Sequence, residues 1–305
     1  MNYRRIAVAV DFSEPSRHAL REAGRLAERS KSELLVLHVA EEHAVHLFEK
    51  ELCGDPKVLE RALDTQLCDW IVQTVSDNVP VQHRVCVGSP GRDLCREAES
   101  FGANLFVAGT RGNSHPNKRL GTIAGMLTRQ ARMPVLLANP DAAPIRCLVV
   151  CLDFSAVCDE LMAHALSIAE TEDLEIHAIH NEPSAIDYYA NLAISSGLEP
   201  YTTSAIDQEL VRAIDQEHSA ALEKFVDAYQ ERARPRRIKP VLTQNLNDAR
   251  GIVDYLNSVP NPLVILGAHG RSGWRDAFVG TTTERVLHCC PGSALVIRSR
   301  ATPHS

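Results

Sequence analysis

The chain contains an internal repeat, and this feature limits the folds that it can adopt. An apolar segment ends in Asp-Phe-Ser twice, at residues 6–13 and 147–155. A later apolar segment ends in a Gly-x-x-Gly turn twice, at residues 109–112 and 267–270. Two ordered signatures that recur together predict two copies of one structural unit.

The length of the chain agrees with two domains. A chain of 305 residues is about twice the ~150 residues of a typical domain. Residues 139–144 contain two prolines in a short polar segment, which is typical of a linker. We therefore predict a first domain over residues 1–141 and a second over residues 142–305.

Each copy alternates short apolar segments with amphipathic ones. The apolar segments are rich in Val, Ile and Leu, as in strands that are covered on both faces of a parallel sheet. The predicted strands are 6–10, 34–39, 81–87, 105–108 and 135–138, then 147–152, 174–180, 238–242, 263–266 and 294–297. The expected fold is α/β, with two tandem, doubly wound, five-stranded parallel-sheet domains and about four helices in each.

Composition and charge narrow the functional classes. The net charge of −7 does not fit a general nucleic-acid binder, and no apolar run approaches the ~20 residues that cross a bilayer. The N-terminus has no secretory segment, and the nine cysteines form no C-x-x-C pair, so we expect buried thiols in a reducing compartment. These features predict a cytoplasmic protein that binds neither nucleic acid nor membrane.

The second copy carries a pattern suited to phosphate binding. Asp153 and Gly267 each follow an apolar strand, and the carboxyl ends of such strands meet where ligands bind in doubly wound sheets. Glycines let the backbone approach a phosphate, and turn amides attract anions. The pair Gly280-Thr281 is expected to open a helix whose first N–H groups favour phosphate. Thr281 and Glu284 also match a capping box.

At these residues the chain resembles the universal stress protein family over nearly its full length. Nucleotide-binding members carry G-x2-G-x9-G-[S/T], and Gly267, Gly270, Gly280 and Thr281 have this spacing. The resemblance implies an adenine-nucleotide alpha-hydrolase-like, Rossmann-like fold that binds ATP, with Mg²⁺, through Asp153 and neighbouring residues. The residues expected to hold the nucleotide are Asp153, Asn181, Gly267, His269, Gly270, Arg271, Gly280, Thr281 and Thr282.

The first copy departs from this pattern. It has eight residues instead of nine between Gly112 and Gly121, and Arg111 replaces the equivalent of His269. A shorter loop shifts its N–H groups by about one residue step of ~3.8 Å, so we expect weaker or absent ATP binding. Val39, in contrast, is the apolar residue that the family often has where the second copy has Asn181. The weaker candidates here are Asp11, Val39, Gly109, Gly112, Gly121 and Thr122.

Other chemistry has less support in the sequence. The chain lacks a P-loop and a Gly-x-Ser-x-Gly elbow, and no carboxylate is placed to activate water, so no catalytic residue is predicted. His43, His46 and Cys53 have a spacing that could suit zinc, but surface side chains are the simpler interpretation, and no metal site is predicted. A weak ATP hydrolase or adenylyl-transfer enzyme, and a non-nucleotide small-molecule binder or scaffold, remain alternatives.

The last strand of each copy is a natural edge for pairing. In the family that the chain resembles, such strands pair protomers. The resemblance therefore implies that the two domains form a pseudo-dimer and that two chains can associate further. The main hypothesis is a stress-response protein, regulatory or signalling rather than catalytic, that binds ATP mainly through its second domain.

Overall fold

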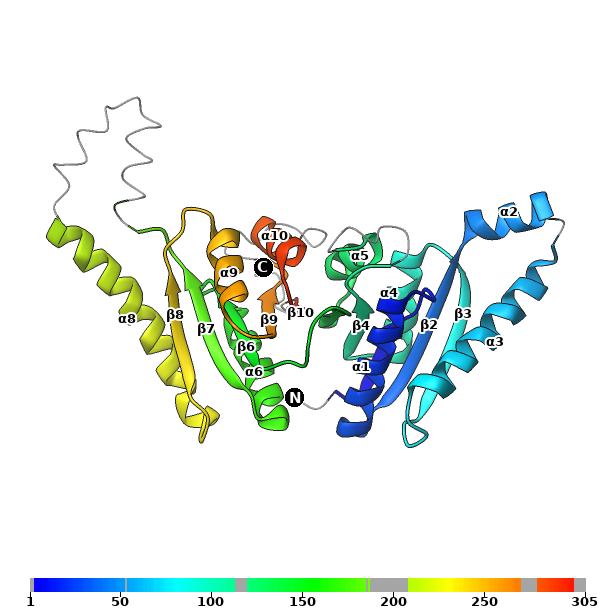
Figure 1. The fold of residues 1–305 in the computed structure, drawn as a ribbon, viewed down its shortest axis with the longest axis horizontal. Coiled ribbons are helices and arrows are strands. Elements are labelled where there is room, and N and C mark those ends of the chain that lie inside the picture. The colour runs from blue at the N-terminus through cyan, green and yellow to red at the C-terminus, as the bar shows by residue number, and fades with distance from the viewer. Residues whose placement is uncertain are drawn as a thin grey trace, which may run out of the picture.

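The fold is described from a computed structural model, which covers residues 3–52, 54–112, 120–184, 186, 208–269 and 279–298. Two predicted site residues, Gly270 and Arg271, lie outside the described residues, as does Cys53. The helices and strands of both copies follow the predicted order (Figure 1). The α/β class predicted from the sequence is confirmed.

In the first copy the order is β1 (Arg5–Ala9), α1 (Glu14–Ser30), β2 (Glu33–Glu41), α2 (Glu42–Leu52), α3 (Pro56–Thr74), β3 (Val81–Gly88), α4 (Pro90–Phe101), β4 (Leu105–Gly109), α5 (Thr122–Gln130) and β5 (Val135–Ala138). In the second copy it is β6 (Cys147–Leu152), α6 (Cys158–Glu172), β7 (Glu175–Asn181), α8 (Gln208–Ala233), β8 (Ile238–Thr243), α9 (Asp248–Ser258), β9 (Pro262–Gly267), α10 (Thr281–Cys289) and β10 (Ser293–Ile297).

The start of α1 follows the local sequence. Ser13 is the N-cap, its side chain accepts from the amide of Ser16, and Pro15 lies in the first turn. The helix ends at Ser30, and its C-cap, Lys31, adopts a left-handed conformation. Its buried face consists of residues at helical spacing, among them Ala19, Leu20 and Ala23.

The ten strands of the described residues form one sheet, in the order β3-β2-β1-β4-β5-β10-β9-β6-β7-β8. Within each copy the paired strands are parallel. The strand order reverses between β1 and β4 and again between β6 and β9, which creates one switch point in each copy. Both Asp-Phe-Ser segments and both glycine turns follow the strands that flank these switch points.

The final strands of the two copies pair with each other. β5 and β10 are antiparallel, with Leu137 opposite Ala294 and Val135 opposite Val296. This pairing was expected from the edge position of both strands, and it merges the two five-stranded sheets into one of ten strands. The copies therefore share a continuous backbone ladder.

Helices cover both faces of the sheet. One apolar layer contains side chains of α1, α3, α6 and α8, and the other contains side chains of α4, α5, α9 and α10. In Figure 1, α3 and α8 lie at the two outer ends of the molecule. Adjacent residues of β1 enter opposite layers: Ile6 and Val8 pack in the first and Ala7 in the second. This alternation follows from the two-residue period of a strand.

Polar contacts reinforce the contact between copies. The guanidinium of Arg25 in α1 lies 2.9 Å from the carboxylate of Glu172 in α6, which Arg29 also contacts. Partial burial alone would raise the pKa of Glu172, but the hydrogen bonds with Arg25 and Arg29 keep it below its usual value. In the linker, the side-chain amide of Asn139 donates to the Pro291 carbonyl at 2.9 Å.

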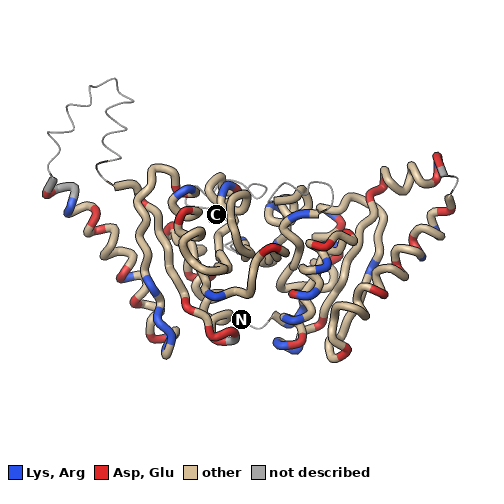
Figure 2. The backbone as a smooth tube through the Cα atoms, in the orientation of Figure 1, with Lys and Arg blue, Asp and Glu red and all other residues tan. Residues whose placement is uncertain are grey.

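Charged residues of both signs are interspersed along both copies in Figure 2.

Among the helices in the described part of the chain, none combines the length and the apolar character that crossing a membrane requires.

The β5–β10 contact gives a prediction about stability. Leu137 of β5 is 1% exposed, and its truncation to alanine removes buried apolar surface and leaves a cavity, so Leu137→Ala should lower the free energy of unfolding by about 2–5 kcal/mol. The control is Leu246→Ala, whose side chain is 52% exposed and whose loss should change stability by less than about 0.5 kcal/mol. Chemical denaturation measures both, and equal effects would contradict the packing described.

Candidate functional site

The first copy brings its aspartate and its glycine turn together. A Cβ atom built on Gly112 would lie 2.3 Å from Oδ2 of Asp11. At Gly109 the neighbour is backbone, because a Cβ there would lie 3.0 Å from the main chain of Pro15. Both glycines therefore lie where two loops approach closely at the switch point.

The second copy repeats this approach. A Cβ atom on Gly267 would lie 3.1 Å from the side chain of Val157, which follows Asp153 as Pro15 follows Asp11. The turn after β9 thus lies against the loop after β6. Of the predicted loop residues, Gly267 and Gly280 lie at this edge, and His269 is half-buried beside them.

Some main-chain amides of the loop already have acceptors. The amide of Gly280 donates to the carbonyl of Ala268 at 2.8 Å, and the amide of Ala268 donates to that of Ile297 at 2.8 Å. In the first copy, Gly121 likewise donates to Thr110 at 2.6 Å. The amide of Gly280 is therefore engaged within its own loop, where its hydrogen bond closes the loop and sets the start of α10.

The capping box that was predicted between Thr281 and Glu284 at the start of α10 is wrong. Gly280, not Thr281, is the N-cap, and it supplies no side-chain hydrogen bond. Glu284 turns toward the other copy, where its carboxylate lies 3.6 Å from the guanidinium of Arg129 in α5. Thr283 uses its hydroxyl to donate to the Gly267 carbonyl at 2.8 Å. The ion pair with Arg129 thus takes the place of the capping bond that was predicted for Glu284.

The first turn of α10 remains the anion-attracting feature of this loop. An α-helix leaves its first N–H groups without intrahelical acceptors. Here these belong to Thr281, Thr282 and Thr283, while the first helical bond runs from Glu284 to Gly280. The equivalent turn of α5 has Thr122, and Gly121 is its N-cap, again without a side-chain bond. The two copies therefore share the same backbone at this point and differ in side chains.

Both aspartates form local turns. Oδ1 of Asp11 accepts from the amide and the hydroxyl of Ser13 at 3.0 and 2.5 Å. Oδ1 of Asp153 accepts from the amide and the hydroxyl of Ser155 at 2.9 and 2.5 Å, and from Sγ of Cys158 at 3.3 Å. These bonds fix one carboxylate oxygen and the orientation of each side chain at the switch point.

Sequence reasoning missed a phenylalanine–histidine pair that recurs in both copies. Phe12 and Phe154 have φ values of 59° and 58°. The Phe12 ring lies 4.6 Å from that of His38, and the Phe154 ring lies 4.5 Å from that of His180. Nonglycine residues seldom adopt such φ values, so the packing must hold them in place. Because each histidine lies 142 residues from its counterpart, comparing the copies would have found the pair.

Each histidine also ties the second strand to the first. Nδ1 of His38 donates to the Val10 carbonyl, and Nδ1 of His180 donates to the Leu152 carbonyl, both at 2.8 Å. A carbonyl only accepts, so Nδ1 carries the proton in both rings. Burial lowers the pKa of His38 below its usual value, against the opposing effects of this bond and of Asp11. This histidine is therefore better suited to holding the turn than to being charged.

The ends of the second strands differ between copies. The side-chain amide of Asn181 donates to the Asn245 carbonyl at 2.8 Å and to Asp248 at 2.9 Å, and its Oδ1 accepts from Thr243 at 3.0 Å. Val39 at the equivalent position is buried in the apolar layer. The side chain of Asn181 is thus committed to the start of α9, and only its main chain faces the end of the strand.

An ion pair neutralises the arginine of the first glycine turn. The guanidinium of Arg111 lies 2.6 Å from the carboxylate of Asp141 in the linker. The arginine is 20% exposed. Arg111 therefore anchors the turn to the linker.

A cavity of about 480 Å³ lies away from both glycine turns, at the seam between copies. Its apolar wall includes Leu105, Leu136, Leu263 and Leu295 from the four central strands. Helices α1 and α6 border it with the charged side chains of Glu22, Arg25 and Glu172. A cavity of this size and lining matches a small-molecule site.

The histidines considered for zinc are on the surface helix α2. Nδ1 of His46 lies 3.8 Å from the carboxylate of Glu49, and 68% of the His46 side chain is exposed.

Most of the described cysteines are buried or half-buried, and Cys289 at the end of α10 is exposed. Burial raises the pKa of the thiols of Cys95 and Cys158 to about 11. These two thiols are therefore poor nucleophiles.

Comparison with known proteins places this geometry in a family. The profile described as the universal stress protein family matches residues 2–139 and 144–298. The chain belongs to the universal stress protein family. Membership supports a role in the response to stress, and the two matches confirm the tandem organisation inferred from the repeat.

Two curated relatives illustrate this membership. Universal stress protein Rv2623 of Mycobacterium tuberculosis is 25% identical over 316 residues, which cover 97% of each chain. Universal stress protein Sll1388 of Synechocystis is 28% identical over 153 residues, which are 46% of this chain and 99% of the relative. The first is similar to the whole tandem chain and the second to one copy.

A solved structure shows the same fold. The crystal structure of a universal stress protein from Archaeoglobus fulgidus matches 98% of this chain and 99% of its own, with a TM-score of 0.63 at 15% identity. At this identity the likeness concerns the fold alone.

The packing of Asn181 gives a second prediction. A Cβ atom on Gly251 of α9 would lie 2.0 Å from Oδ1 of Asn181, so Gly251→Ala should destabilise this universal stress protein by about 1–3 kcal/mol. In the double variant with Asn181→Ala the clash disappears, and the combined cost should be smaller than the sum of the single costs.

The matched control is Gly125→Ala in α5, where the nearest atoms are 3.5 Å away or more. The higher helix propensity of alanine should stabilise this variant by about 0.5–1 kcal/mol. Thermal and urea unfolding of the four variants measure these effects. Additive costs at Asn181 and Gly251 would show that the two residues do not touch.

Proposed function

We propose that this protein binds an adenine nucleotide, ATP with Mg²⁺, mainly through its second copy, and acts in the stress response as a regulator rather than an enzyme. The observation that carries the proposal is the first turn of α10, at the carboxyl edge of β9 and beside the switch point. Three consecutive threonines, Thr281, Thr282 and Thr283, form that turn. They follow the sequence Gly267-x-x-Gly270, nine residues and Gly280.

Phosphate binding at this turn has a direct physical basis. The three N–H groups point out of the helix end, where the dipole also favours an anion. The hydroxyls of Thr281, which is exposed, and of Thr282, which is half-buried, can add hydrogen bonds. Arg129 of the first copy pairs with Glu284 in the same turn and so offsets the negative charge of that carboxylate. Arg271 would add a cation from the loop.

The first copy is a weaker candidate for the same reasons. At the position of Thr282 it has Ile123, so one of the two hydroxyls that could bond to a phosphate is lost. Its loop arginine, Arg111, is paired with Asp141. These differences add to the loop that is one residue shorter, and they support assigning the nucleotide to the second copy.

The rest of the nucleotide would lie along the same edge of the sheet. Asp153 at the end of β6 would contact the ribose, and the main chain of Asn181 at the end of β7 would contact adenine. Mg²⁺ is usually bound by one or two carboxylates together with substrate phosphates, and Asp153 is a carboxylate at this edge. Its Oδ1 is oriented by Ser155, which fits a positioning role.

The wider predictions remain part of this proposal. The domains divide at residues 1–141 and 142–305, the antiparallel β5–β10 ladder makes one chain a pseudo-dimer, and two chains associate further. The protein acts in the cytoplasm. The ladder itself supports the pseudo-dimer, because it leaves neither final strand as an open edge within the chain.

ATP binding is tested by placing a negative charge in the first turn of α10. Thr282→Glu places a carboxylate where the phosphates are expected, yet a helix tolerates an acidic residue in its first turn. We expect Thr282→Glu to weaken ATP binding, measured by calorimetry with Mg²⁺, by about tenfold or more, which corresponds to the loss of one charge-assisted contact. The mirror control is Ile123→Glu, at the same helix position of the first copy, where the side chain is half-buried against the apolar layer. Once circular dichroism shows that this variant is folded, its affinity should stay within about twofold of the original, because the first copy is distant from the proposed site.

Two results would contradict the assignment. One is that the unaltered protein binds no nucleotide by calorimetry and releases none on denaturation, as judged by mass spectrometry. The other is that Ile123→Glu weakens binding while Thr282→Glu does not, which would move the site to the first copy.

The seam cavity favours one second candidate, a site for a small apolar molecule. Its leucine wall and its rim of Glu22, Arg25 and Glu172 suit a ligand with an apolar body and a polar end. The same release experiment distinguishes the two functions, because an apolar molecule recovered in place of a nucleotide would favour this cavity.

A further inference from the structure

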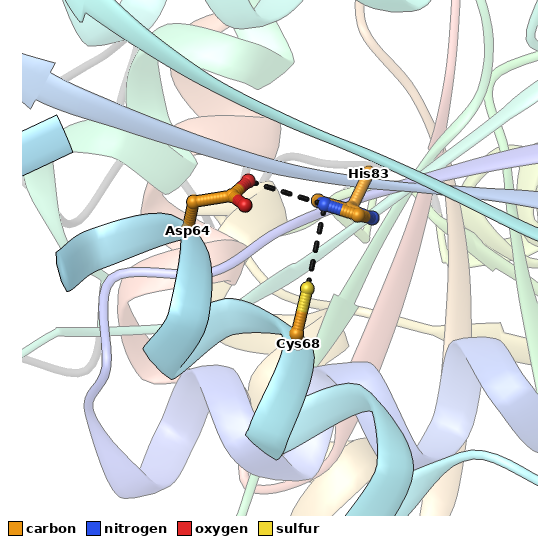
Figure 3. Close-up of side chains that lie close together, drawn as sticks. All are labelled: Asp64, Cys68 and His83. Carbon is orange, nitrogen blue, oxygen red and sulfur yellow. Dashed lines mark hydrogen bonds and ion pairs between the residues drawn. The ribbon is translucent and has the colours of Figure 1, made fainter. Parts of the chain in front are cut away.

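We propose that Asp64, Cys68 and His83 form a binding site for a thiophilic divalent cation, of which Zn²⁺ is the representative. The three side chains converge between α3 and β3 (Figure 3). Their ligand atoms all lie within 4.8 Å of one another. Neither the nucleotide proposal nor the seam cavity uses any of these residues.

The distances within the cluster are close to those of a metal site. Nε2 of His83 lies 3.1 Å from Oδ1 of Asp64 and 3.4 Å from Sγ of Cys68. In a tetrahedral zinc site with bond lengths of about 2.1 Å to N and O and about 2.3 Å to S, the N–O and N–S separations are about 3.4 and 3.6 Å. Shifts of a few tenths of an ångström would therefore bring Nε2 of His83 to these separations from the other two ligands. The third pair, the Asp64 carboxylate oxygen and Sγ of Cys68, lies within 4.8 Å and would close to about 3.6 Å around one ion.

Regular secondary structure holds the ligands in this arrangement. Asp64 and Cys68 are four residues apart on α3 and so share one face of the helix. His83 comes from β3, the edge strand of the sheet, which α3 packs against. The position of His83 is fixed by its place opposite Val36 in the β2–β3 ladder. A backbone of this kind sets the site before any ion arrives, which reduces the ordering that binding requires.

The donor types and the exposure fit a cation. Carboxylate, thiolate and imidazole are the three side-chain ligands that zinc uses. The Asp64 side chain is 50% exposed and that of His83 is 35% exposed, so solvent reaches the cluster and a water molecule could occupy a fourth position. Such an open site is typical of zinc that is exchangeable rather than buried in a closed structural centre.

A reactive cysteine is a less suitable explanation for the cluster. Partial burial and the charges of Asp64 and Asp69 raise the pKa of the Cys68 thiol. Cysteine nucleophiles and redox sensors have the opposite environment, in which positive charge favours the thiolate.

The second copy provides a natural comparison. Its helix α8 places Leu222 and Phe225 in the core where α3 places Leu67 and Trp70. With this alignment Ser219 and Glu223 stand at the positions of Asp64 and Cys68, and Pro240 stands at that of His83. The shared fold therefore does not require the cluster, which belongs to the first copy alone.

A bound cation would act on the switch point of the first copy through α3. Trp70, two residues after Cys68, packs edge-to-face on Phe12 at 5.4 Å between centroids, and Arg17 stacks on the same indole at 4.4 Å. Phe12 directly follows Asp11. An ion that links α3 to β3 would thus fix the helix that supports this turn, and Trp70 reports on its environment.

The test is a titration of the full chain with Zn²⁺ alone against a chromophoric chelator, with Co²⁺ as a spectroscopic substitute. We expect one ion per chain and, for Co²⁺, an intense visible band of tetrahedral coordination together with a thiolate charge-transfer band. In Trp274→Phe, Trp70 is the single tryptophan left, and its fluorescence should change with the same stoichiometry.

Variants locate the site. Cys68→Ser and His83→Gln should each weaken Zn²⁺ binding by about tenfold or more and remove the thiolate band or alter it. Cys86→Ser is the matched control, a half-buried thiol on the same strand as His83, and it should bind as the unaltered protein does. His43→Gln controls for the histidines of α2. Circular dichroism shows whether each variant is folded.

Three results would overturn the proposal. The unaltered protein could bind no Zn²⁺ at micromolar concentrations. It could bind the ion with an affinity that folded Cys68→Ser retains. Finally, Cys86→Ser or His43→Gln could abolish binding as completely as Cys68→Ser does, which would place the ion elsewhere.

Discussion

The antiparallel backbone ladder between β5 and β10 sets how the two copies are placed relative to each other. It turns two parallel sheets into one sheet of ten strands, so that α1 and α6 meet across the seam and Arg25 can pair with Glu172. It also encloses the leucine-lined cavity and brings Arg129 of the first copy to the first turn of α10 in the second. A single strand pairing thus gives each copy access to residues of the other.

Within this frame the two copies keep the same turn and change what surrounds it. The left-handed phenylalanine, the histidine that donates to the first strand and the aspartate bonded to serine occur in both. Around this shared framework, the second copy has a threonine-rich helix start, whereas the first has an arginine paired with the linker and the Asp64–Cys68–His83 cluster. The framework supports the strand ends, and the variable residues would determine what each copy binds.

The sequence alone predicted the parts of the structure that depend on local patterns. The strands, most helices and the pairing of the last strands follow from periodicity and edge position. It failed where a tertiary partner outcompeted a local one. Glu284 pairs with Arg129 of the other copy instead of capping α10. The Asp64–Cys68–His83 cluster was missed because its members meet only once α3 packs on β3, a contact that no spacing in the sequence encodes.

The central claim is that the nucleotide binds at the first turn of α10, and hydrogen exchange of individual amides tests it most directly. The account predicts that ATP with Mg²⁺ slows exchange at Thr281, Thr282 and Thr283, while the corresponding amides at the start of α5 exchange as before. Slowed exchange at the start of α5 with no change in α10, or no change at either helix under saturating ATP, would contradict it.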